Sequence, residues 1–156
     1  MLANIVPVAT GDNWVGYGVR SFRSIISELI KSANTEILMT AYLLTNRDII
    51  TEIETALKRG VNVTIYLYDD RKKITKTEAV KSAFKLTEEF PYLFIKVVKN
   101  KVLHAKILIV DGKKTLVGSA NLTQPAMLSN YELGFVVEDP TISGQITDLI
   151  RRMDKI

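Results

Sequence analysis

Segments with helically spaced apolar residues alternate with short runs of β-branched residues along this chain, and this alternation restricts its fold more than any other feature. The spacing predicts a first helix near residues 18–33, followed by a strand in the run TEILMTAYLL at 35–44. A second helix is expected to end at Gly60, before the strand run VNVTIYLY at 61–68. We therefore expect an α/β protein, an α/β/α sandwich with a mixed central sheet.

Start signals mark the later helices. Thr45 with Asp48, and Thr75 with Glu78, resemble capping boxes at the starts of two helices. Asp139 as N-cap and Pro140 as first residue predict a closing helix. Its inward side chains are expected to be Ile142, Ile146, Leu149, Ile150 and Met153.

Several short strands complete the expected sheet. Strands are predicted near 93–98 and 105–110, and Asp111-Gly112 is a dipeptide typical of a tight hairpin leading into KKTLVGS at 113–119. The run YELGFVVED at 131–139 predicts one more strand.

Composition restricts both the organisation and the chemistry. With 156 residues, 47% of them hydrophobic, the chain suits a single domain over residues 1–156. It has no cysteine and one histidine, which excludes a thiol nucleophile and makes a zinc site of cysteine or histidine ligands implausible. The sequence shows neither the pattern of a signal peptide nor the roughly 20 apolar residues of a membrane span, so we expect a soluble, cytoplasmic protein.

Positive charge is concentrated in the middle of the chain. Residues 67–114 carry twelve basic and six acidic residues, within a net charge of +4 for the whole sequence. The densest stretch, RKKITKTEAVK, places Arg71, Lys72, Lys73 and Lys76 close together. It is either a solvated helix face or a surface that attracts phosphate groups.

The stretch LHAKILIVDGKKTLVGSANLT at 103–123 contains the candidate chemistry. Strand alternation would place His104 and Lys106 on one face, about 7 Å apart, where both can meet one ligand. Downstream, Gly118 allows close backbone approach, while Ser119 and Asn121 offer a hydroxyl and an amide. This set suits a phosphate, because lysine and asparagine stabilise oxyanions and imidazole can attack phosphorus or transfer protons. The alternative is a hairpin of no chemical interest whose histidine ends a strand.

The full spacing resembles the signature of the phospholipase D superfamily, the HKD motif: His104-x-Lys106, four residues, Asp111, six residues, then Gly118-Ser119-x-Asn121. Residues 41–70 look like the lead-in to that motif, and Glu132 stands where family members carry a carboxylate. In size and single-motif layout the chain is similar to the small nuclease branch of the family, in which two subunits each contribute one motif.

This resemblance implies a mechanism. His104 would attack phosphorus and form a phosphohistidine, while His104 of a second subunit protonates the leaving oxygen, so the partner is a second copy in a homodimer. Lys106 and Asn121 would hold the non-bridging oxygens, and Ser119 would add a hydroxyl contact. Glu132 would accept the far N–H of His104, unless it is only an exposed strand residue. No metal or cofactor is required.

The remaining candidates have structural alternatives. Asp111, followed by Gly112, is explained as a turn residue rather than a chemical group. Packing is favoured over base stacking for Tyr42, Trp14 and Tyr17. The adjacent Asp69 and Asp70 point in opposite directions and make an unconvincing metal site.

The motif alone does not identify the substrate, because lipids and nucleic acids share the phosphodiester group. The basic segment favours nucleic acid, DNA or RNA, and hence a metal-independent nuclease. A phospholipase or phosphatidyl transferase, and a non-catalytic nucleic-acid-binding module, are the alternatives.

Overall fold

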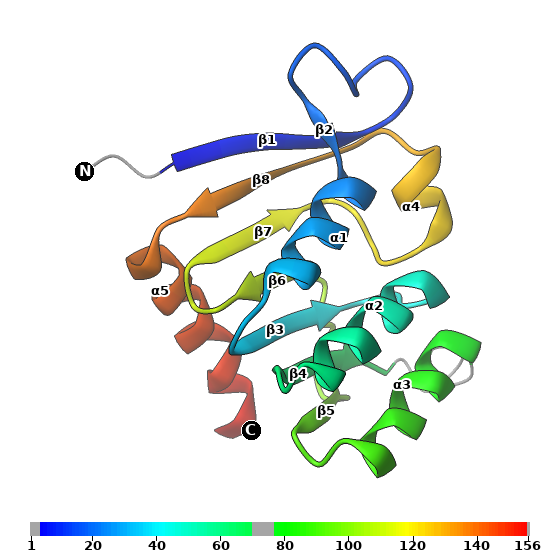
Figure 1. The fold of residues 1–156 in the computed structure, drawn as a ribbon, viewed down its shortest axis with the longest axis vertical. Helices are drawn as coiled ribbons and strands as arrows, with labels where there is room; N and C mark the ends of the chain where they lie inside the picture. Colours follow the sequence, from blue (N-terminus) through cyan, green and yellow to red (C-terminus); the bar gives the residue numbers. More distant parts are fainter. Residues whose placement is uncertain (1–3, 70–76, 156) are drawn as a thin grey trace.

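A computed structural model of the chain describes residues 4–69 and 77–155, which form one eight-stranded sheet flanked by helices (Figure 1). The strand order is β2-β1-β8-β7-β6-β3-β4-β5. Strands β3, β4 and β5 are parallel to one another, whereas β6, β7 and β8 run antiparallel to their neighbours. The predicted α/β class with a mixed central sheet is confirmed.

The elements have the following bounds. The strands are β1 (Asn4–Thr10), β2 (Arg20–Ser21), β3 (Glu36–Ala41), β4 (Asn62–Tyr68), β5 (Leu93–Val98), β6 (Ile107–Val110), β7 (Lys114–Gly118) and β8 (Glu132–Glu138). The helices are α1 (Phe22–Ser32), α2 (Arg47–Lys58), α3 (Glu78–Glu89), α4 (Gln124–Leu128), α5 (Pro140–Arg151) and the short 3₁₀ helix η2 (Arg152–Lys155).

Two apolar clusters lie on opposite faces of the sheet. The larger joins the buried faces of α1, α2 and α3 to one sheet face, with Ile30, Ile53 and Leu57 essentially inaccessible. The smaller lies under α5, where Ile150 packs with Leu38, Leu103, Tyr66 and Ile109. Burying apolar side chains on both faces is what stabilises a layered sheet of this kind.

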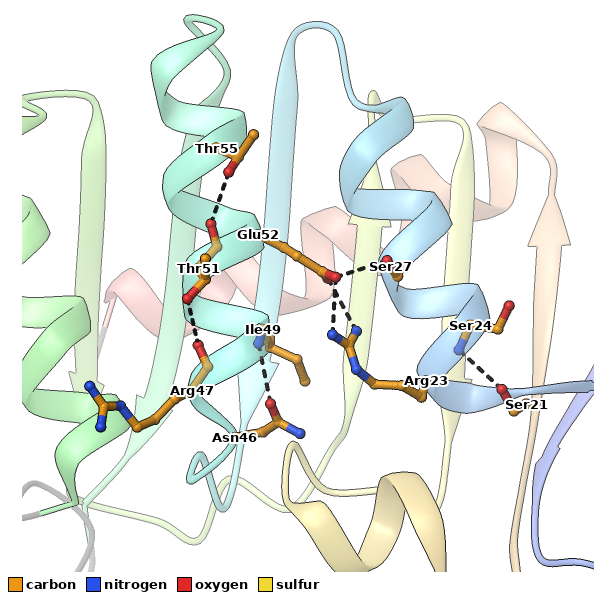
Figure 2. Close-up of polar contacts among 10 residues, drawn as sticks. All are labelled: Ser21, Arg23, Ser24, Ser27, Asn46, Arg47, Ile49, Thr51, Glu52 and Thr55. Atoms are coloured by element: carbon orange, nitrogen blue, oxygen red, sulfur yellow. Dashed lines mark hydrogen bonds and ion pairs between the residues drawn. The ribbon is translucent and has the colours of Figure 1, made fainter.

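Two helices begin at residues other than those predicted. The N-cap of α2 is Asn46 rather than Thr45, because the Asn46 side chain accepts a hydrogen bond from the backbone N–H of Ile49 (Figure 2). The N-cap of α3 is Thr77, whose hydroxyl accepts from the N–H of Val80. The predicted cap Thr75 lies outside the described residues.

Other boundaries agree more closely with the sequence pattern. The first helix begins at Phe22, because Ser21 caps it, and is shorter than the expected range of 18–33. Gly60, at φ 88°, follows the end of α2 as predicted. Asp111 and Gly112, at φ 55° and 63°, form the predicted hairpin between β6 and β7.

The closing helix begins at Pro140 with Asp139 as its cap, as predicted, but its inward face is narrower than expected. Leu149 is 57% exposed, so its predicted inward orientation is wrong. The predicted side chains that pack in the cluster under this helix are Ile150 and, in part, Ile146 and Met153. Ser143 is also buried, and it shares a hydrogen bond with Thr115 of β7.

Polar contacts join the first two helices (Figure 2). Both guanidinium nitrogens of Arg23 on α1 contact the carboxylate of Glu52 on α2, at 3.0 and 3.2 Å, and Ser27 donates to the same carboxylate at 2.8 Å. Bidentate pairs of this kind have fixed geometry, so they set how α1 and α2 lie against each other.

A second polar network anchors the C-terminal segment. The hydroxyl of buried Tyr66 donates to Asp154 at 2.7 Å, and Lys96 contacts the same carboxylate at 2.9 Å. The hydrogen bonds from Lys96 and Tyr66 hold the pKa of Asp154 below its ordinary value. None of the described helices has the length and apolar character that crossing a bilayer requires.

Candidate active site

The motif residues meet at one edge of the sheet. Register places the carboxyl ends of β1, β3 and β7 beside the amino ends of β6 and β8, and the arrowheads of β3, β6, β7 and β8 can be followed in Figure 1. Residues that leave or enter these strands at this edge include His104 and Lys106 before β6, Ser119 after β7, and Glu132 at the start of β8.

His104 and Lys106 are in direct contact. The sequence pattern predicted a strand near 105–110, but β6 begins only at Ile107. Both residues therefore lie in the segment that leads into the strand. The Nζ of Lys106 lies 3.2 Å from Nδ1 of His104 and donates to the His104 carbonyl oxygen at 2.8 Å. An ammonium group has only donors, so in the tautomer whose unprotonated nitrogen faces Lys106 the ring accepts a hydrogen bond from it.

Thr40, at the end of β3, holds this segment in place. Its hydroxyl donates to the carbonyl oxygen of Ala105 at 2.7 Å and accepts from the N–H of Ile107 at 3.0 Å. The side chain is 2% exposed, and the buried Leu103 anchors the other side of His104. Sequence reasoning missed Thr40, because nothing in a strand's local pattern shows that its hydroxyl bridges a distant loop.

Partial burial lowers the pKa of the Lys106 ammonium below its ordinary value, and the negative charge of Glu132 acts in the opposite direction. A desolvated cation interacts more strongly with an incoming anion than a hydrated one does. Lys106 is therefore a partly desolvated cation beside the imidazole, and an anion that reached this edge would interact strongly with it.

Glu132 is hydrogen-bonded to Ser119 rather than to His104. The Ser119 hydroxyl donates to one carboxylate oxygen, and Asn130 donates to the other at 3.2 Å. Ser119 also accepts from the N–H of Leu133 at 3.1 Å. No hydrogen bond joins Glu132 to His104 among the described residues, so the contact expected from the sequence is not formed here.

Asn121 is fixed through its neighbour Leu122. The N–H of Leu122 donates to the Leu43 carbonyl at 3.1 Å, and the Leu122 carbonyl accepts from Thr45 and Asn46. The Oδ1 of Asn121 is buried and has no hydrogen-bond partner within the described part of the chain. A buried amide oxygen without a protein partner is costly, and water, an ion or a ligand commonly supplies the missing partner.

A glycine is required at residue 118 by packing against β8 and against α1, on the sheet face that α1 covers. It pairs with Gly134 of β8, and the ring of Phe22 lies over both glycines. A Cβ at residue 118 would lie 2.7 Å from the Cα of Gly134 and 2.9 Å from Cζ of Phe22. The sequence assigned Gly118 to close backbone approach, and within this chain the backbone of β8 approaches it most closely, with the Phe22 ring next.

Asp111 lies at the hairpin, at the other end of β6 from His104. Its carboxylate accepts hydrogen bonds from the backbone N–H groups of Asn34, Thr35 and Glu36 and from the Thr35 hydroxyl. Burial acts to raise the pKa of Asp111, but these hydrogen bonds outweigh it and leave the pKa below its ordinary value. Asp111 therefore holds the turn before β3.

Two aromatic groups flank the site. Tyr42 stacks on Tyr68 with ring centroids 5.4 Å apart, and its other neighbour is the His104 ring at 4.8 Å. On the opposite flank, Trp14 contacts Tyr131, the residue before Glu132, at 4.8 Å. Tyr17 is fully exposed. Sequence reasoning considered Tyr42, Trp14 and Tyr17 but not Tyr131.

The predicted substrate-binding residues Arg71, Lys72, Lys73 and Lys76 lie outside the described residues, as does Asp70. Within residues 4–69 and 77–155, no group of three histidine or acidic side chains is arranged to hold a metal ion.

A comparison with known families matches residues 26–153 to the family described as "Cardiolipin synthase, PLD-like domain". The match covers most of the chain, including every motif residue from His104 to Glu132. The chain belongs to this phospholipase D-like family. The HKD spacing read from the sequence is thus placed within a recognised domain.

Solved structures show the same fold. This phospholipase D-like chain is similar to Nuc of Salmonella typhimurium, a phospholipase D family member, with a TM-score of 0.81, 23% identity, and coverage of 99% of this chain and 95% of that one. It is also similar to NucT of Helicobacter pylori, with a TM-score of 0.72, 22% identity, and coverage of 85% and 87%.

Other proteins share the fold over part of their length. TrmBL2, an archaeal chromatin protein that binds DNA, has a TM-score of 0.68 at 18% identity, with 97% of this phospholipase D-like chain aligned to 52% of that protein. A comparison with the sequences of curated proteins found no match.

Proposed function

We propose that the protein is a metal-independent nuclease that forms a covalent phosphohistidine at a site shared by two copies of the chain. Family membership supports phosphodiester chemistry at a coarser level. The observation that carries the proposal is the contact between the chain's one imidazole and Lys106 at the same sheet edge as Ser119, Asn121 and Glu132.

The first step is attack on phosphorus. A lone pair of the His104 ring forms a bond to phosphorus, and the bond from phosphorus to the leaving oxygen breaks. In the second step, water attacks the phosphohistidine, its oxygen bonds to phosphorus, and the phosphorus–nitrogen bond breaks. Lys106 and Asn121 hold the non-bridging oxygens through both steps, with no metal ion required.

Proton transfer requires a second imidazole. Attack and departure occur in line on opposite sides of phosphorus, so the ring that attacks cannot also protonate the leaving oxygen. Each chain contains a single histidine, His104. We therefore assign the acid in the first step, and the base that takes the proton from water in the second, to His104 of a second copy related by a two-fold axis.

Glu132 acts through Ser119 in this proposal. The carboxylate accepts the hydrogen bond of the Ser119 hydroxyl and so fixes the direction of its O–H bond. The N–H of Leu133 donates to the same hydroxyl oxygen, so the orientation of the whole group is set. The Glu132 charge also favours the protonated form of Lys106, the form that binds a phosphate oxygen. Glu132 is therefore a positioning residue.

An exposed apolar sheet face supports docking of a second copy. On the face opposite α1, strands β1, β7 and β8 expose Ile5, Val117, Leu133 and Phe135, each by 39–56%. Exposed apolar patches of this kind mark interaction sites. The patch runs directly into the site, because Ser119 follows β7 and Leu133 follows Glu132. A partner bound to this patch would reach the edge of the sheet where His104, Ser119 and Glu132 meet, which we call the catalytic edge.

Nucleic acid is the proposed substrate because of charge. The segment containing Arg71, Lys72, Lys73 and Lys76 joins the end of β4, at the catalytic edge, to α3. A cluster of cations close in sequence to a strand that ends at this edge favours a polyanionic substrate. Reversing Lys72 and Lys73 to glutamate should weaken binding of every nucleic acid and flatten its salt dependence.

Phosphatidyl transfer is the second candidate. The matching family carries the name of cardiolipin synthase, and phosphatidylserine synthase of Haemophilus influenzae has this fold with a TM-score of 0.67 at 15% identity. That likeness covers 99% of this chain but 38% of the synthase. The same His104 chemistry would act on a phospholipid if a lipid phosphate occupied the site.

Incubation with labelled single- and double-stranded DNA and RNA, in excess EDTA, tests the proposal. Cleavage that persists in chelator and disappears in His104→Ala is the expected result. Parallel incubation with phosphatidylglycerol vesicles separates the two candidates. Lipid turnover without nucleic-acid cleavage, or cleavage that depends strictly on added Mg²⁺ or Mn²⁺, would refute the nuclease.

A further inference from the structure

The contact between Trp14 and Tyr131 forms an exposed aromatic pair. Trp14 lies in the loop between β1 and β2, and Tyr131 immediately precedes β8, so the two rings come from distant parts of the sequence. Their centroids lie 4.8 Å apart with an interplanar angle of 41°. Trp14 is nevertheless 46% exposed and Tyr131 60% exposed. Aromatic side chains of this size are normally much better buried when they serve only the core.

The backbone is shaped to hold this pair. A Cβ at Gly11 would lie 2.6 Å from Cδ1 of Tyr131, so only glycine allows the ring to lie where it does. Gly11 also has φ 122°, a conformation that other residues rarely adopt. The Tyr131 hydroxyl accepts a long hydrogen bond from Asn13 at 3.5 Å. The Tyr131 ring is therefore fixed against the loop while much of its surface stays open to solvent.

The pair lies beside the catalytic edge. Tyr131 is next to Glu132, which accepts the Ser119 hydrogen bond and acts on the charge of Lys106. Strands β8 and β6 are separated by β7 alone, so the backbone at Tyr131 lies about 10 Å from the His104 segment by strand spacing. That distance corresponds to one or two nucleotides of an extended strand whose phosphate occupies the site.

The surroundings favour a nucleobase over a lipid. The neighbours of the two rings in sequence include Asp12, Asn13, Ser129 and Asn130, which are polar. Amide and hydroxyl groups can hydrogen-bond to base edges, whereas inserting them with Asp12 into a bilayer is costly. An aromatic face stacks on any base, but a base paired within a duplex does not expose its face.

We infer that the Trp14–Tyr131 pair is a stacking site for an unpaired base of the substrate, near the phosphate that reacts at His104. The inference rests on the proposed nuclease function and adds that single-stranded nucleic acid, or a locally unpaired stretch, is the preferred substrate. The pair is a binding subsite rather than a catalytic one.

Trp14 is the chain's only tryptophan, so its fluorescence reports on this site directly. The His104→Ala variant is titrated with an unlabelled single strand of about 12 thymidylates, a length within the usual range of single-strand sites. Binding is measured separately by the anisotropy of a labelled strand. Saturable quenching of Trp14 at the concentrations where anisotropy rises is expected, with a smaller effect for a blunt duplex.

Tyr131→Ala, introduced in the same background, should weaken single-strand binding by about 5- to 100-fold, as expected for the loss of one base–aromatic stack. Phe94→Ala is the matched control, because Phe94 is 53% exposed on the edge strand β5 and lies at the strand end away from the site. It should leave binding unchanged. Circular dichroism melts confirm that both variants are folded.

The possible failures are distinguishable. If the strand binds by anisotropy but Trp14 emission is unchanged, or Tyr131→Ala binds normally, the stacking site is refuted and the nuclease proposal stands. If no nucleic acid binds at all, the proposed function fails and the stacking site fails with it. If emission responds instead to phosphatidylglycerol vesicles, or to dilution without ligand, the pair contacts lipid or a second copy, and the inference is wrong.

Discussion

The ammonium nitrogen of Lys106 lies 3.2 Å from Nδ1 of His104 and 2.8 Å from the carbonyl oxygen of the same residue. The lysine thus contacts both the proposed nucleophile and the backbone that carries it. An incoming phosphate oxygen would compete with the His104 carbonyl and the ring for the hydrogen bonds that this ammonium group donates. Lys106 and His104 are therefore already side by side before substrate arrives.

Lys106→Met should lower kcat by about 10²- to 10³-fold, because it removes a donor that stabilises charge on the reacting phosphate. Methionine keeps most of the side-chain length, so the melting temperature should change little. Lys113→Met, at the hairpin tip, is the matched control and should keep normal activity. Steady-state rates at saturating substrate provide the measurement. Equal losses in both variants would mean that Lys106 contributes only general positive charge.

Subunit mixing tests the shared site. If each site requires His104 from both chains, equal amounts of normal and His104→Ala protein should retain about a quarter of the activity of an all-normal sample after free exchange. Capture of tagged subunits first establishes that exchange has occurred. Activity that falls in proportion to the normal fraction, rather than to its square, would show that one chain suffices.

Phe135→Glu should separate the proposed dimer. Phe135 is 44% exposed at the middle of the apolar sheet face, so the charge is tolerated by the monomer but not beneath a partner. Sedimentation should show monomers, with activity lost in parallel. Phe94→Glu, on the far edge strand, should remain dimeric. A Phe135→Glu protein that is still dimeric would place the interface elsewhere.

The Asp154 network predicts a pH dependence of stability. Because the pKa of Asp154 is lowered in the folded state, its contribution is present above the ordinary value of 3.8 and is lost as pH falls through the folded value. Asp154→Ala should lower the melting temperature by about 4–8 °C at neutral pH, as for the two hydrogen bonds lost from Tyr66 and Lys96, and by less near pH 3. Glu88→Ala, on α3, is the control. Melts that differ equally at every pH would contradict the charge argument.

Local sequence patterns predicted those parts of the fold that depend on neighbouring residues. The helix start at Asp139-Pro140 and the hairpin at Asp111-Gly112 have strong local preferences, and both are present. The start of α2 was misplaced by one residue, because Thr45 and Asn46 are both good caps. In the structure both backbone N–H groups donate to Leu122, far along the chain, and the Asn46 side chain caps the helix.

In the candidate site, too, the sequence predicted what depends on local spacing and missed what depends on distant residues. Motif spacing brought His104, Lys106, Ser119 and Glu132 to attention, and the structure places them at one edge. Motif spacing could not identify the hydrogen-bond partner of Glu132, because the choice between His104 and Ser119 depends on strand register. Thr40 and Tyr131 were missed for a similar reason. Thr40 contacts Ala105, and Tyr131 packs against Gly11, so in each case the partner is distant in the sequence.

The Phe22 ring lies over Gly118 and Gly134, so the residue allowed at motif position 118 depends on packing between the sheet and α1. A side chain at either glycine would have to displace the ring and also separate β7 from β8, which would move Ser119 away from Glu132. Residues 22, 118 and 134 are therefore expected to vary together among relatives. A smaller residue at 22 would not by itself permit alanine at 118, because the added Cβ would still lie 2.7 Å from the Gly134 Cα and 2.8 Å from the Leu133 carbonyl oxygen. Attempts to redesign this site for other phosphodiesters should begin by keeping that triplet intact.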